Sequence, residues 1–451
     1  MRKEYLDLFS PNNLEKAYKE LKSKKITTGT DHISKKKFDT IYNNAFLDLY
    51  PKIESKSYKP SSYREVLLMK NRDSKPRALS LPTIKDKVVL SILRKILHDN
   101  FVSKLELVRV EDIIKNICQT IISEKYDYCI KIDITNYYGS IKHKLLLEKV
   151  SKFVNYDIDL LELIDLFLKN KNISEDGKKS YHITTGVPQG ISISNILGNI
   201  YLNDFDYEML SLDCKYYRYV DDILIFCHKN DSNFLFDFVK NHFKPLYLKL
   251  NNRKVTKGVI DNIDFLGYNF NKDGIISISV KNIKKLERSL DKIFIEYKSS
   301  QNKRVKNNIK LLKWKIDFRI TGCVKDDRRF GWVIYFNLNQ DEKIMHHLDW
   351  YIVKLAKKYR LEDELLIKNQ YIGKRFVKTY HEFKGKRDYT DYIPNINKYT
   401  KEEKQNVLID ICNRNRDRIL GLSDFFLERE FQRFIFSSIR DIEMDLNQIY
   451  T

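Results

Sequence analysis

The sequence predicts an α+β fold, in which a mixed part of helices and short strands precedes a mostly helical part. The first observation is a set of short apolar runs, typical of strands, before residue 275. These runs lie at residues 63–70, 75–81, 128–133 and 223–226. The second observation is that apolar residues recur at helical spacing beyond residue 275. The third is size, because 451 residues, 42% of them hydrophobic, can fill more than one core.

The chain is expected to begin with helices. Residues 1–60 have helical character, with Asp31 or Ser34 as N-caps and a break at residues 58–60. The first two strands then enclose a polar turn at residues 71–74. Further helices are expected over residues 84–98, from 188–190 to Tyr201, and over 303–319 and 339–359.

The helical pattern is clearest just beyond residue 275. One helix face is apolar, and Lys and Arg occupy the other face. The apolar positions are Ile283, Leu286, Leu290, Ile293 and Phe294. An amphipathic helix of this kind is expected to pack its apolar face onto the rest of the domain.

Charge narrows the class of partner. The formal net charge is +21, from 82 Lys and Arg against 61 Asp and Glu. A polyanion is favoured, because each neutralised phosphate releases a condensed counterion. A Lys-rich chain that is merely soluble is the alternative, and charge alone does not name the nucleic acid.

Cysteine usage and hydropathy indicate the compartment. The six cysteines, at positions 118, 129, 214, 227, 323 and 412, form no Cys-x-x-Cys pair and have no zinc-ligand spacing. Buried, reduced thiols are the simplest interpretation. The first residues lack the apolar core of a signal peptide, and no run approaches the ~20 apolar residues that cross a membrane. A cytoplasmic protein without a membrane partner is expected.

An acidic pair is the first candidate for chemistry. Asp221 and Asp222 are flanked by strand residues and are expected at the tip of a tight hairpin. Nucleotidyl transfer requires such a tip, because two divalent ions about 4 Å apart must hold the attacking oxygen and the triphosphate. Hard cations select carboxylate oxygens. Taken alone, an Asp-Asp pair in so charged a chain is more often a solvated turn.

Two other segments change this interpretation. Asp133 ends an apolar strand, so it can complete a metal site from a neighbouring strand. Between Asp133 and the acidic pair, Gly186 and Gly190 bracket a Pro-Gln turn where backbone can approach a base pair closely. Gln189 in this turn offers both a hydrogen-bond donor and an acceptor. In isolation, the turn would read as an ordinary loop that enters a core helix.

In this order, the three segments resemble motifs A, B and C of reverse transcriptases. Residues 219–222 (Tyr-Val-Asp-Asp) match the Tyr-x-Asp-Asp signature, and residues 187–190 (Val-Pro-Gln-Gly) match the core of motif B. Residues 70–77 look like the fingers hairpin that clasps the triphosphate, 250–256 like motif D, and 265–268 like the primer-grip hairpin. The resemblance covers residues 28–275, about half of the chain.

The resemblance implies a right-hand polymerase fold of fingers, palm and thumb, with an antiparallel palm sheet and an all-α C-terminal region. Fingers and palm are expected over residues 1–275, including the N-terminal helical extension 1–60. A helical thumb is expected over 276–375 and a helical C-terminal region over 376–451. The implied activity is RNA-directed DNA synthesis from deoxynucleoside triphosphates.

The resemblance also implies roles for single residues. Asp133, Asp221 and Asp222 would be catalytic and would hold two Mg²⁺ ions, with Mn²⁺ as a possible substitute. The backbone carbonyl of Ile134 is a further expected ligand. The remaining nucleotide contacts implied are Lys70, Arg77, Tyr138, Gln189 and Lys254.

Two of these contacts have alternatives. Tyr138 falls at the steric-gate position, where an aromatic ring collides with a ribose 2′ hydroxyl. The alternative is that Tyr138 packs in the core, as aromatic pairs such as Tyr137–Tyr138 usually do. Lys254 would protonate or neutralise the leaving pyrophosphate, and a solvated loop lysine is equally compatible with the sequence.

The lineage is narrowed by further motifs. Bacterial group II intron and retron enzymes are the nearest relatives by motif, but residues 255–258 depart from the retron Val-Thr-Gly, and no intron-type endonuclease pattern follows the thumb. Residues 192–197, 320–332 and 346–350 resemble defence-associated bacterial reverse transcriptases, in particular the first enzyme of the two-polymerase type-3 defence systems. That resemblance implies a noncoding RNA template, a companion reverse transcriptase and protection against phage. A homo- or hetero-oligomer is also expected.

Some alternatives stay open. A catalytically silent, polymerase-shaped RNA-binding scaffold is the main rival, and the intact acidic triad favours activity. A retron or intron enzyme is disfavoured by its missing motifs, and an RNA-directed RNA polymerase fits Tyr138 poorly. His346, His347 and Asp349 are interpreted as a packed helix rather than a metal site. Residues 328–332 and 368–378 interleave cations with aromatic rings, which suits RNA contact or an exposed helix equally.

Overall fold

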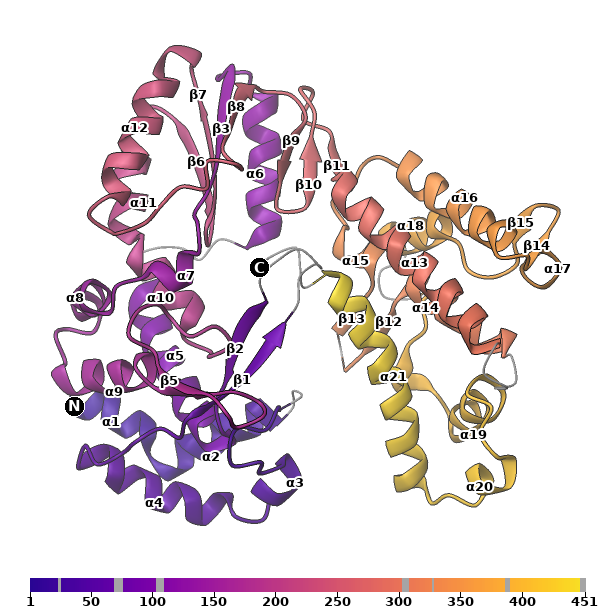
Figure 1. Cartoon of the computed structure of the whole chain (residues 1–451), viewed down its shortest axis with the longest axis horizontal. Coiled ribbons are helices and arrows are strands. Elements are labelled where there is room, and N and C mark those ends of the chain that lie inside the picture. The colour runs from indigo at the N-terminus through magenta and orange to yellow at the C-terminus, as the bar shows by residue number, and fades with distance from the viewer. Residues whose placement is uncertain are drawn as a thin grey trace. The chain divides into compact units, whose positions relative to one another are not determined.

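The computed structural model divides the chain into two compact units, Met1–Ile260 and Asp261–Thr451 (Figure 1). Each unit is described by itself. The structure describes residues 1–22, 26–68, 76–102, 109–301, 308–326, 328–385 and 390–446.

The first unit begins with the expected helices. Their bounds are α1 Lys3–Leu6, the 3₁₀ turn η1 Asp7–Phe9, α2 Pro11–Lys22, α3 Lys35–Phe38 and α4 Tyr42–Glu54. Ser34 is the N-cap of α3, because its hydroxyl accepts the backbone N–H of Lys37. Asp31, the other predicted cap, accepts the N–H of Ile33 in the turn before α3.

A four-stranded sheet follows, in the order β2-β1-β4-β5. The strands are β1 Tyr63–Leu68, β2 Arg77–Leu81, β4 Lys171–Ile173 and β5 Ser180–His182. The predicted pair β1 and β2 is antiparallel, and β4 adds to β1 in parallel. The sequence did not predict β4 and β5, because three-residue strands with mostly polar side chains carry no apolar alternation.

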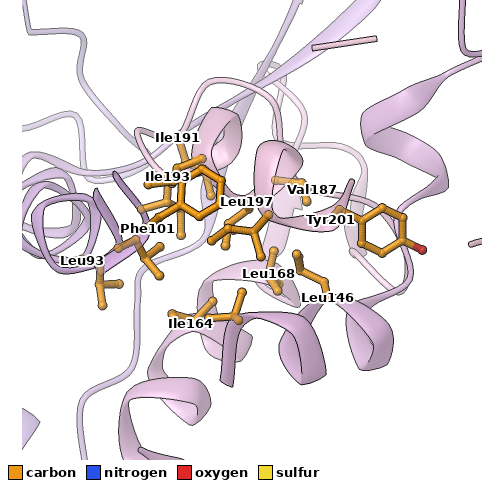
Figure 2. Close-up of a cluster of buried hydrophobic side chains, with 14 of the residues drawn as sticks. Leu93, Phe101, Leu146, Ile164, Leu168, Val187, Ile191, Ile193, Leu197 and Tyr201 are labelled. Carbon is orange, nitrogen blue, oxygen red and sulfur yellow. The ribbon is translucent and has the colours of Figure 1, made fainter. Parts of the chain in front are cut away.

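A helical core supports the motif B segment. It is formed by α5 Ile84–Val102, α8 His143–Phe153, α9 Ile158–Leu168 and α10 Ser194–Tyr201. Figure 2 shows side chains from all four helices meeting, among them Leu93, Leu146, Ile164 and Leu197. Each of these four is at most 1% exposed. Burial of this kind contributes roughly 1.5–3 kcal/mol per side chain, so α10 rests on a well-packed base.

The second sheet of this unit has the order β6-β7-β3-β8, with every neighbouring pair antiparallel. Its strands are β3 Tyr128–Asp133, β6 Lys215–Tyr219, β7 Asp222–Cys227 and β8 Thr256–Val259. The helices α6 Val110–Ile122, α11 Asn203–Leu210 and α12 Ser232–Phe243 flank it (Figure 1). Side chains of β6 alternate between faces: Tyr217 bonds to α6, whereas Tyr216 bonds to α11. The antiparallel palm sheet implied by the resemblance is therefore present.

The second unit opens with a three-stranded sheet in the order β11-β10-β9. Strands β9 Ile263–Phe265 and β10 Tyr268–Phe270 are joined by Leu266 and Gly267, both with positive φ, of 47° and 85°. This two-residue turn is the type favoured in hairpins, and it lies where the primer-grip resemblance predicts a hairpin. The third strand is β11 Ile276–Ile278.

Helices make up most of the remainder, as expected. They are α13 Val280–Gln301, α14 Ile309–Thr321, α15 Trp332–Tyr335, α16 Lys343–Lys358, α17 Glu362–Leu365, α18 Phe376–Gly385, α19 Lys401–Asn406, α20 Arg416–Leu420 and α21 Asp424–Leu446. Two small hairpins interrupt them: β12 Cys323–Lys325 with β13 Arg328–Phe330, and β14 Leu366–Ile367 with β15 Gln370–Tyr371. The sequence did not predict these hairpins.

On α16, the two histidines and Asp349 reach different partners. His347 contacts Glu287 of α13 at 2.6 Å, and His346 lies 3.5 Å from Glu342. Asp349 instead accepts the backbone N–H of Phe376 at the start of α18. The three side chains therefore do not share one site, as their helical spacing predicts, but the two histidines lie on the surface rather than on a packed face.

The six cysteines are present as thiols and are buried or half-buried. Burial raises their pKa values, to about 11 for Cys129, Cys214 and Cys412 and to about 12 for Cys227 and Cys323. In the part of the chain that the structure describes, no helix is both long enough and apolar enough to span a membrane.

Candidate active site

The acidic pair lies at a hairpin tip, as the sequence predicts. Strands β6 and β7 are in register up to Tyr219 and Asp222, so Val220 and Asp221 form a two-residue turn. Val220 has a φ of 57°. This left-handed conformation costs a β-branched residue roughly 1–2 kcal/mol, and such strain is typical of functional sites.

Asp133 lies directly opposite Asp222 across the palm sheet. The two residues are paired in the antiparallel register of β3 and β7, so their side chains leave the sheet on the same face. The next residue, Ile134, donates its backbone N–H to the carbonyl of Asp221 at 3.3 Å. The predicted adjacency of Asp133 to the acidic turn is therefore confirmed.

The Asp133 carboxylate already has two partners in this structure. Lys254 places its Nζ 2.7 Å from one oxygen, and Asn251 donates from its side chain to the other at 3.0 Å. The backbone N–H of Asn251 also donates to the carbonyl of Asp133. The motif D segment is thus bonded to the end of β3, and Lys254 is paired with Asp133 although its side chain remains largely exposed.

The exposed Lys254 contributes little to stability through this ion pair, because its side chain is 64% exposed and solvent screens the attraction. Its importance is local, since it sets a positive charge beside Asp133.

Among the described residues, no group of three or more His, Cys, Asp or Glu side chains is gathered closely enough to hold a metal ion.

The other two carboxyl groups are electrostatically unfavourable when charged. Burial raises the pKa of Asp222 to about 6, and the charges of Asp221 and Asp133 add to this shift. Burial likewise raises the pKa of Asp221, with a further contribution from Asp133, while Arg77 and Lys254 oppose it. The cluster supplies the negative charge and the hard oxygen donors that a divalent cation prefers, but in this structure its three carboxyl groups do not converge on one metal position.

Tyr138 belongs to the short helix α7, Tyr137–Ser140, just after Asp133. Its ring is partly exposed and its hydroxyl donates to Asn195 of α10 at 3.2 Å. Burial raises the pKa of the Tyr138 hydroxyl, and the nearby Asp221 charge adds to the effect. Tyr137 is the core residue of the two, only 3% exposed and bonded to the carbonyl of Gly198.

The motif B turn is fixed to both neighbours by backbone contacts. The N–H of Val187 donates to the carbonyl of Tyr138 at 2.8 Å, and the carbonyl of Gln189 accepts the N–H of Ser80 in β2 at 2.7 Å. Gly186 has a φ of 87°, and a Cβ there would lie 2.8 Å from the Cα of Gly139. Glycine is therefore required by close approach as well as by conformation.

The fingers contribute Arg77 at the start of β2. Burial lowers the pKa of its guanidinium, while the charges of Asp221 and Tyr138 act in the opposite direction. Lys70, its predicted companion, lies outside the residues that the structure describes.

Residues 69–270 match the family model described as "Reverse transcriptase (RNA-dependent DNA polymerase)". This segment contains β3, the motif B turn, the acidic hairpin and Lys254. Residues 69–270 of this chain therefore form a reverse transcriptase domain.

Two curated proteins show the same similarity. The chain is 27% identical over 221 residues to the group II intron-encoded protein LtrA of Lactococcus lactis subsp. cremoris, covering 48% of this chain and 36% of that protein. It is 26% identical over 191 residues to protein YkfC of Escherichia coli strain K12, covering 40% and 49% respectively. The chain therefore matches between about a third and a half of each relative.

Solved structures similar to this chain include two of telomerase. Apo telomerase from Candida tropicalis is 13% identical with a TM-score of 0.43, over 72% of this chain and 63% of that one. Telomerase from Candida albicans, in complex with a fragment of telomeric RNA, is 16% identical with a TM-score of 0.40, over 68% and 60%.

Proposed function

We propose that this protein is an RNA-directed DNA polymerase that uses divalent metal ions. The single observation that carries the proposal is the register of Asp133 with Asp222, which places two carboxylates on one face beside the Asp221 turn. It is supported by the reverse transcriptase domain in which these residues lie.

Asp133, Asp221 and Asp222 would hold the two Mg²⁺ ions, with Mn²⁺ as a substitute, and the carbonyl of Ile134 would complete the set. Bound cations would neutralise the triphosphate and lower the pKa of the attacking 3′ hydroxyl. The chain's part is to keep the carboxylates ionised and aligned. Asn251 does so at Asp133, where its side chain donates to one carboxylate oxygen.

The surrounding residues would bind and orient the incoming nucleotide. Arg77, with Lys70, would contact the triphosphate through charge-assisted hydrogen bonds. Gln189 would lie against the templating base pair, at a turn that is bonded to the fingers strand β2. Lys254, already 2.7 Å from Asp133, would deliver a proton toward the leaving pyrophosphate.

The biological setting is a further part of the proposal. The motif resemblance of residues 192–197, 320–332 and 346–350 supports a defence-associated bacterial enzyme that acts in the cytoplasm. It would copy a noncoding RNA, work beside a companion reverse transcriptase, and protect against phage through its DNA product. We propose that fingers and palm end at residue 275 and that the thumb ends at residue 375, where the C-terminal region begins.

The test is the double variant Asp221→Asn with Asp222→Asn. Loss of metal-holding carboxylates should reduce DNA synthesis at least ~10³-fold, because several kcal/mol of transition-state stabilisation are lost. Synthesis would be measured by primer extension on a defined RNA template with Mg²⁺. Asp213→Asn, at an exposed position in the loop before β6, is the matched control and should leave the rate unchanged.

Two other outcomes would change the conclusion. Near-wild-type synthesis by the double variant would exclude this site. A wild-type protein that binds RNA but makes no DNA, under conditions that support other enzymes, would favour the silent scaffold. Sequencing the RNA and DNA that copurify with the wild-type protein would identify the template.

A further inference from the structure

A buried arginine lies directly before the acidic hairpin. Arg218 is on β6, and its side chain is only 8% exposed. Its Nε donates to Asp206 of α11 at 2.7 Å, and its Nη2 donates to the second oxygen of the same carboxylate. Asp206, with an 11% exposed side chain, also accepts the hydroxyl of Tyr216 at 2.8 Å. The pair is therefore bidentate and shielded from water.

The third nitrogen of the guanidinium reaches the catalytic turn. Nη1 of Arg218 donates to the carbonyl of Val220 at 3.0 Å and to the side chain of Asn199 in α10 at 3.2 Å. One side chain thus ties two helices to the strained residue that precedes Asp221. Asp206 uses only Nε and Nη2, so the buried Nη1 needs acceptors of its own, and it finds one of them in the carbonyl of the turn.

We propose that Arg218 and Asp206 are positioning residues that fix the Val220 carbonyl, and so set Asp221 and Asp222 for metal binding. The inference rests on the proposed function, because it assumes that these carboxylates hold the cations. Asp206 orients the guanidinium, and the guanidinium holds the turn in its left-handed conformation. Neither residue touches substrate.

The planar fork of Arg218 is the essential feature. Lysine at this position would keep a positive charge near Asp206, but a single ammonium cannot make the bidentate pair and also reach Val220. Arg218→Lys should therefore loosen the turn while largely preserving the charge. Asp206→Asn should act similarly by releasing the guanidinium from its orienting carboxylate.

The first measurement needs no catalysis. Hydrogen exchange of the peptide that spans residues 215–224 should be at least tenfold faster in Arg218→Lys than in wild type. Mn²⁺ binding to the protein alone, followed by electron paramagnetic resonance, should weaken about tenfold. The matched control is Asp204→Asn, which removes a carboxylate from the same helix, α11, paired with Lys149 and not with Arg218. It should change neither quantity.

The second measurement is DNA synthesis at increasing Mg²⁺. Arg218→Lys and Asp206→Asn should raise the Mg²⁺ concentration for half-maximal synthesis about tenfold, and Asp204→Asn should not. Val220→Gly should partly restore Arg218→Lys, because glycine adopts positive φ without the cost that valine incurs. If Arg218→Lys does not fold, Asp206→Asn is assessed against Asp204→Asn by the same measurements.

The outcomes separate the two proposals. Lower thermal stability in Arg218→Lys and Asp206→Asn, with unchanged exchange, Mn²⁺ binding and Mg²⁺ dependence, would overturn the positioning role and leave the proposed function intact. Absence of DNA synthesis by the wild type would overturn the proposed function. Faster exchange of the turn in the variants would then still establish the contact as the element that holds the hairpin.

Discussion

At the scale of single residues, we expect the Tyr138 side chain to determine the preference for deoxyribonucleotides over ribonucleotides. Its ring is partly exposed on α7, its hydroxyl is held by Asn195, and its neighbour Tyr137 occupies the core. Steric overlap with a 2′ hydroxyl rises steeply with distance, so discrimination can be large without a hydrogen bond. Tyr138→Val should admit ribonucleotides while synthesis from deoxynucleotides continues.

The measurement compares incorporation of ribo- and deoxynucleotides by wild type and Tyr138→Val on one RNA template. A fall in discrimination of at least tenfold is expected. Unchanged discrimination would place the selection elsewhere, in the fingers, and a wild-type preference for ribonucleotides would make the protein an RNA polymerase.

The acidic cluster should cost folding stability when no metal is bound. The pKa of Asp222 is about 6 in the folded protein, whereas an unfolded Asp has a pKa of about 3.9. Between these values the folded state binds the proton more tightly, so stability falls as pH rises from about 4 to 6. Above pH 6 the full cost of the charge remains.

Asp222→Asn removes this charge with little change of shape. In chelated buffer at pH 8, the variant should be more stable than wild type by about 1–2 kcal/mol, after allowance for partial solvent screening. Thermal unfolding should show a rise of a few degrees that disappears near pH 4. Equal stability at pH 8 would mean that the Asp222 charge is solvated in the folded protein.

Residues that belong to an ordered motif were predictable, whereas residues that act through a tertiary contact were not. The Tyr-Val-Asp-Asp segment, Asp133 and Lys254 follow from motif order, and the structure brings Asp133, Lys254 and the acidic turn together. The sequence does not single out Asn251, because asparagine is common in polar loops that have no catalytic role. The role of Arg218 was not predictable, because its partner Asp206 lies on another element and only tertiary packing brings the two together.

At the scale of elements, the motif B turn depends on the absence of a side chain at Gly186. A Cβ there would meet the Cα of Gly139 at 2.8 Å and the carbonyl of Tyr138 at 2.9 Å, at a φ of 87°. Gly186→Ala should destabilise the protein by about 2–4 kcal/mol, from backbone strain and overpacking together.

The matched control is Gly177→Ala in the β4–β5 turn. Gly177 also has a positive φ, of 71°, but a Cβ there would meet nothing within 4 Å. Its replacement should cost only about 1 kcal/mol. Denaturant unfolding of both variants would separate conformational strain from close approach, and equal losses would show that packing against α7 is not tight.

Element ends were harder to predict than element types. The helical run expected from residues 188–190 begins only at Ser194, because Gly190 has a φ of 103° and the Ser194 hydroxyl bonds to the carbonyls of Pro188 and Ile191. Helix α6 was not predicted although its face of buried isoleucines is regular. Its pattern is visible in retrospect, because Ile113, Ile117 and Ile121 follow helical spacing.

At the scale of the whole molecule, the hairpin that resembles a primer grip belongs with the second compact unit. The Tyr268 hydroxyl donates to the carbonyl of Tyr335, and its ring contacts that of Phe336 at 5.4 Å. Phe265 and Phe270 beside it are at most 1% exposed. A fragment that ends at residue 275 would therefore keep this hairpin without its partners.

A fragment of residues 1–260 should fold better than one of residues 1–275. The shorter fragment retains the large apolar core of the first unit, whose buried members end at Leu248. The longer one would expose the buried aromatic rings of the hairpin and should bind a hydrophobic dye and self-associate. Size-exclusion chromatography and thermal unfolding would compare them, and the reverse order would support a boundary at 275.

Because its thiols are buried, the native protein should react slowly with maleimides. At a pKa of about 11, only about one thiol in ten thousand is a reactive thiolate at neutral pH. A cysteine introduced in place of the exposed Lys178, in the β4–β5 turn, should react with maleimide faster than the native cysteines. A dye could thus be attached at one site with every native cysteine left in place. A change in the dye's fluorescence during nucleotide addition would report whether the β2-β1-β4-β5 sheet moves.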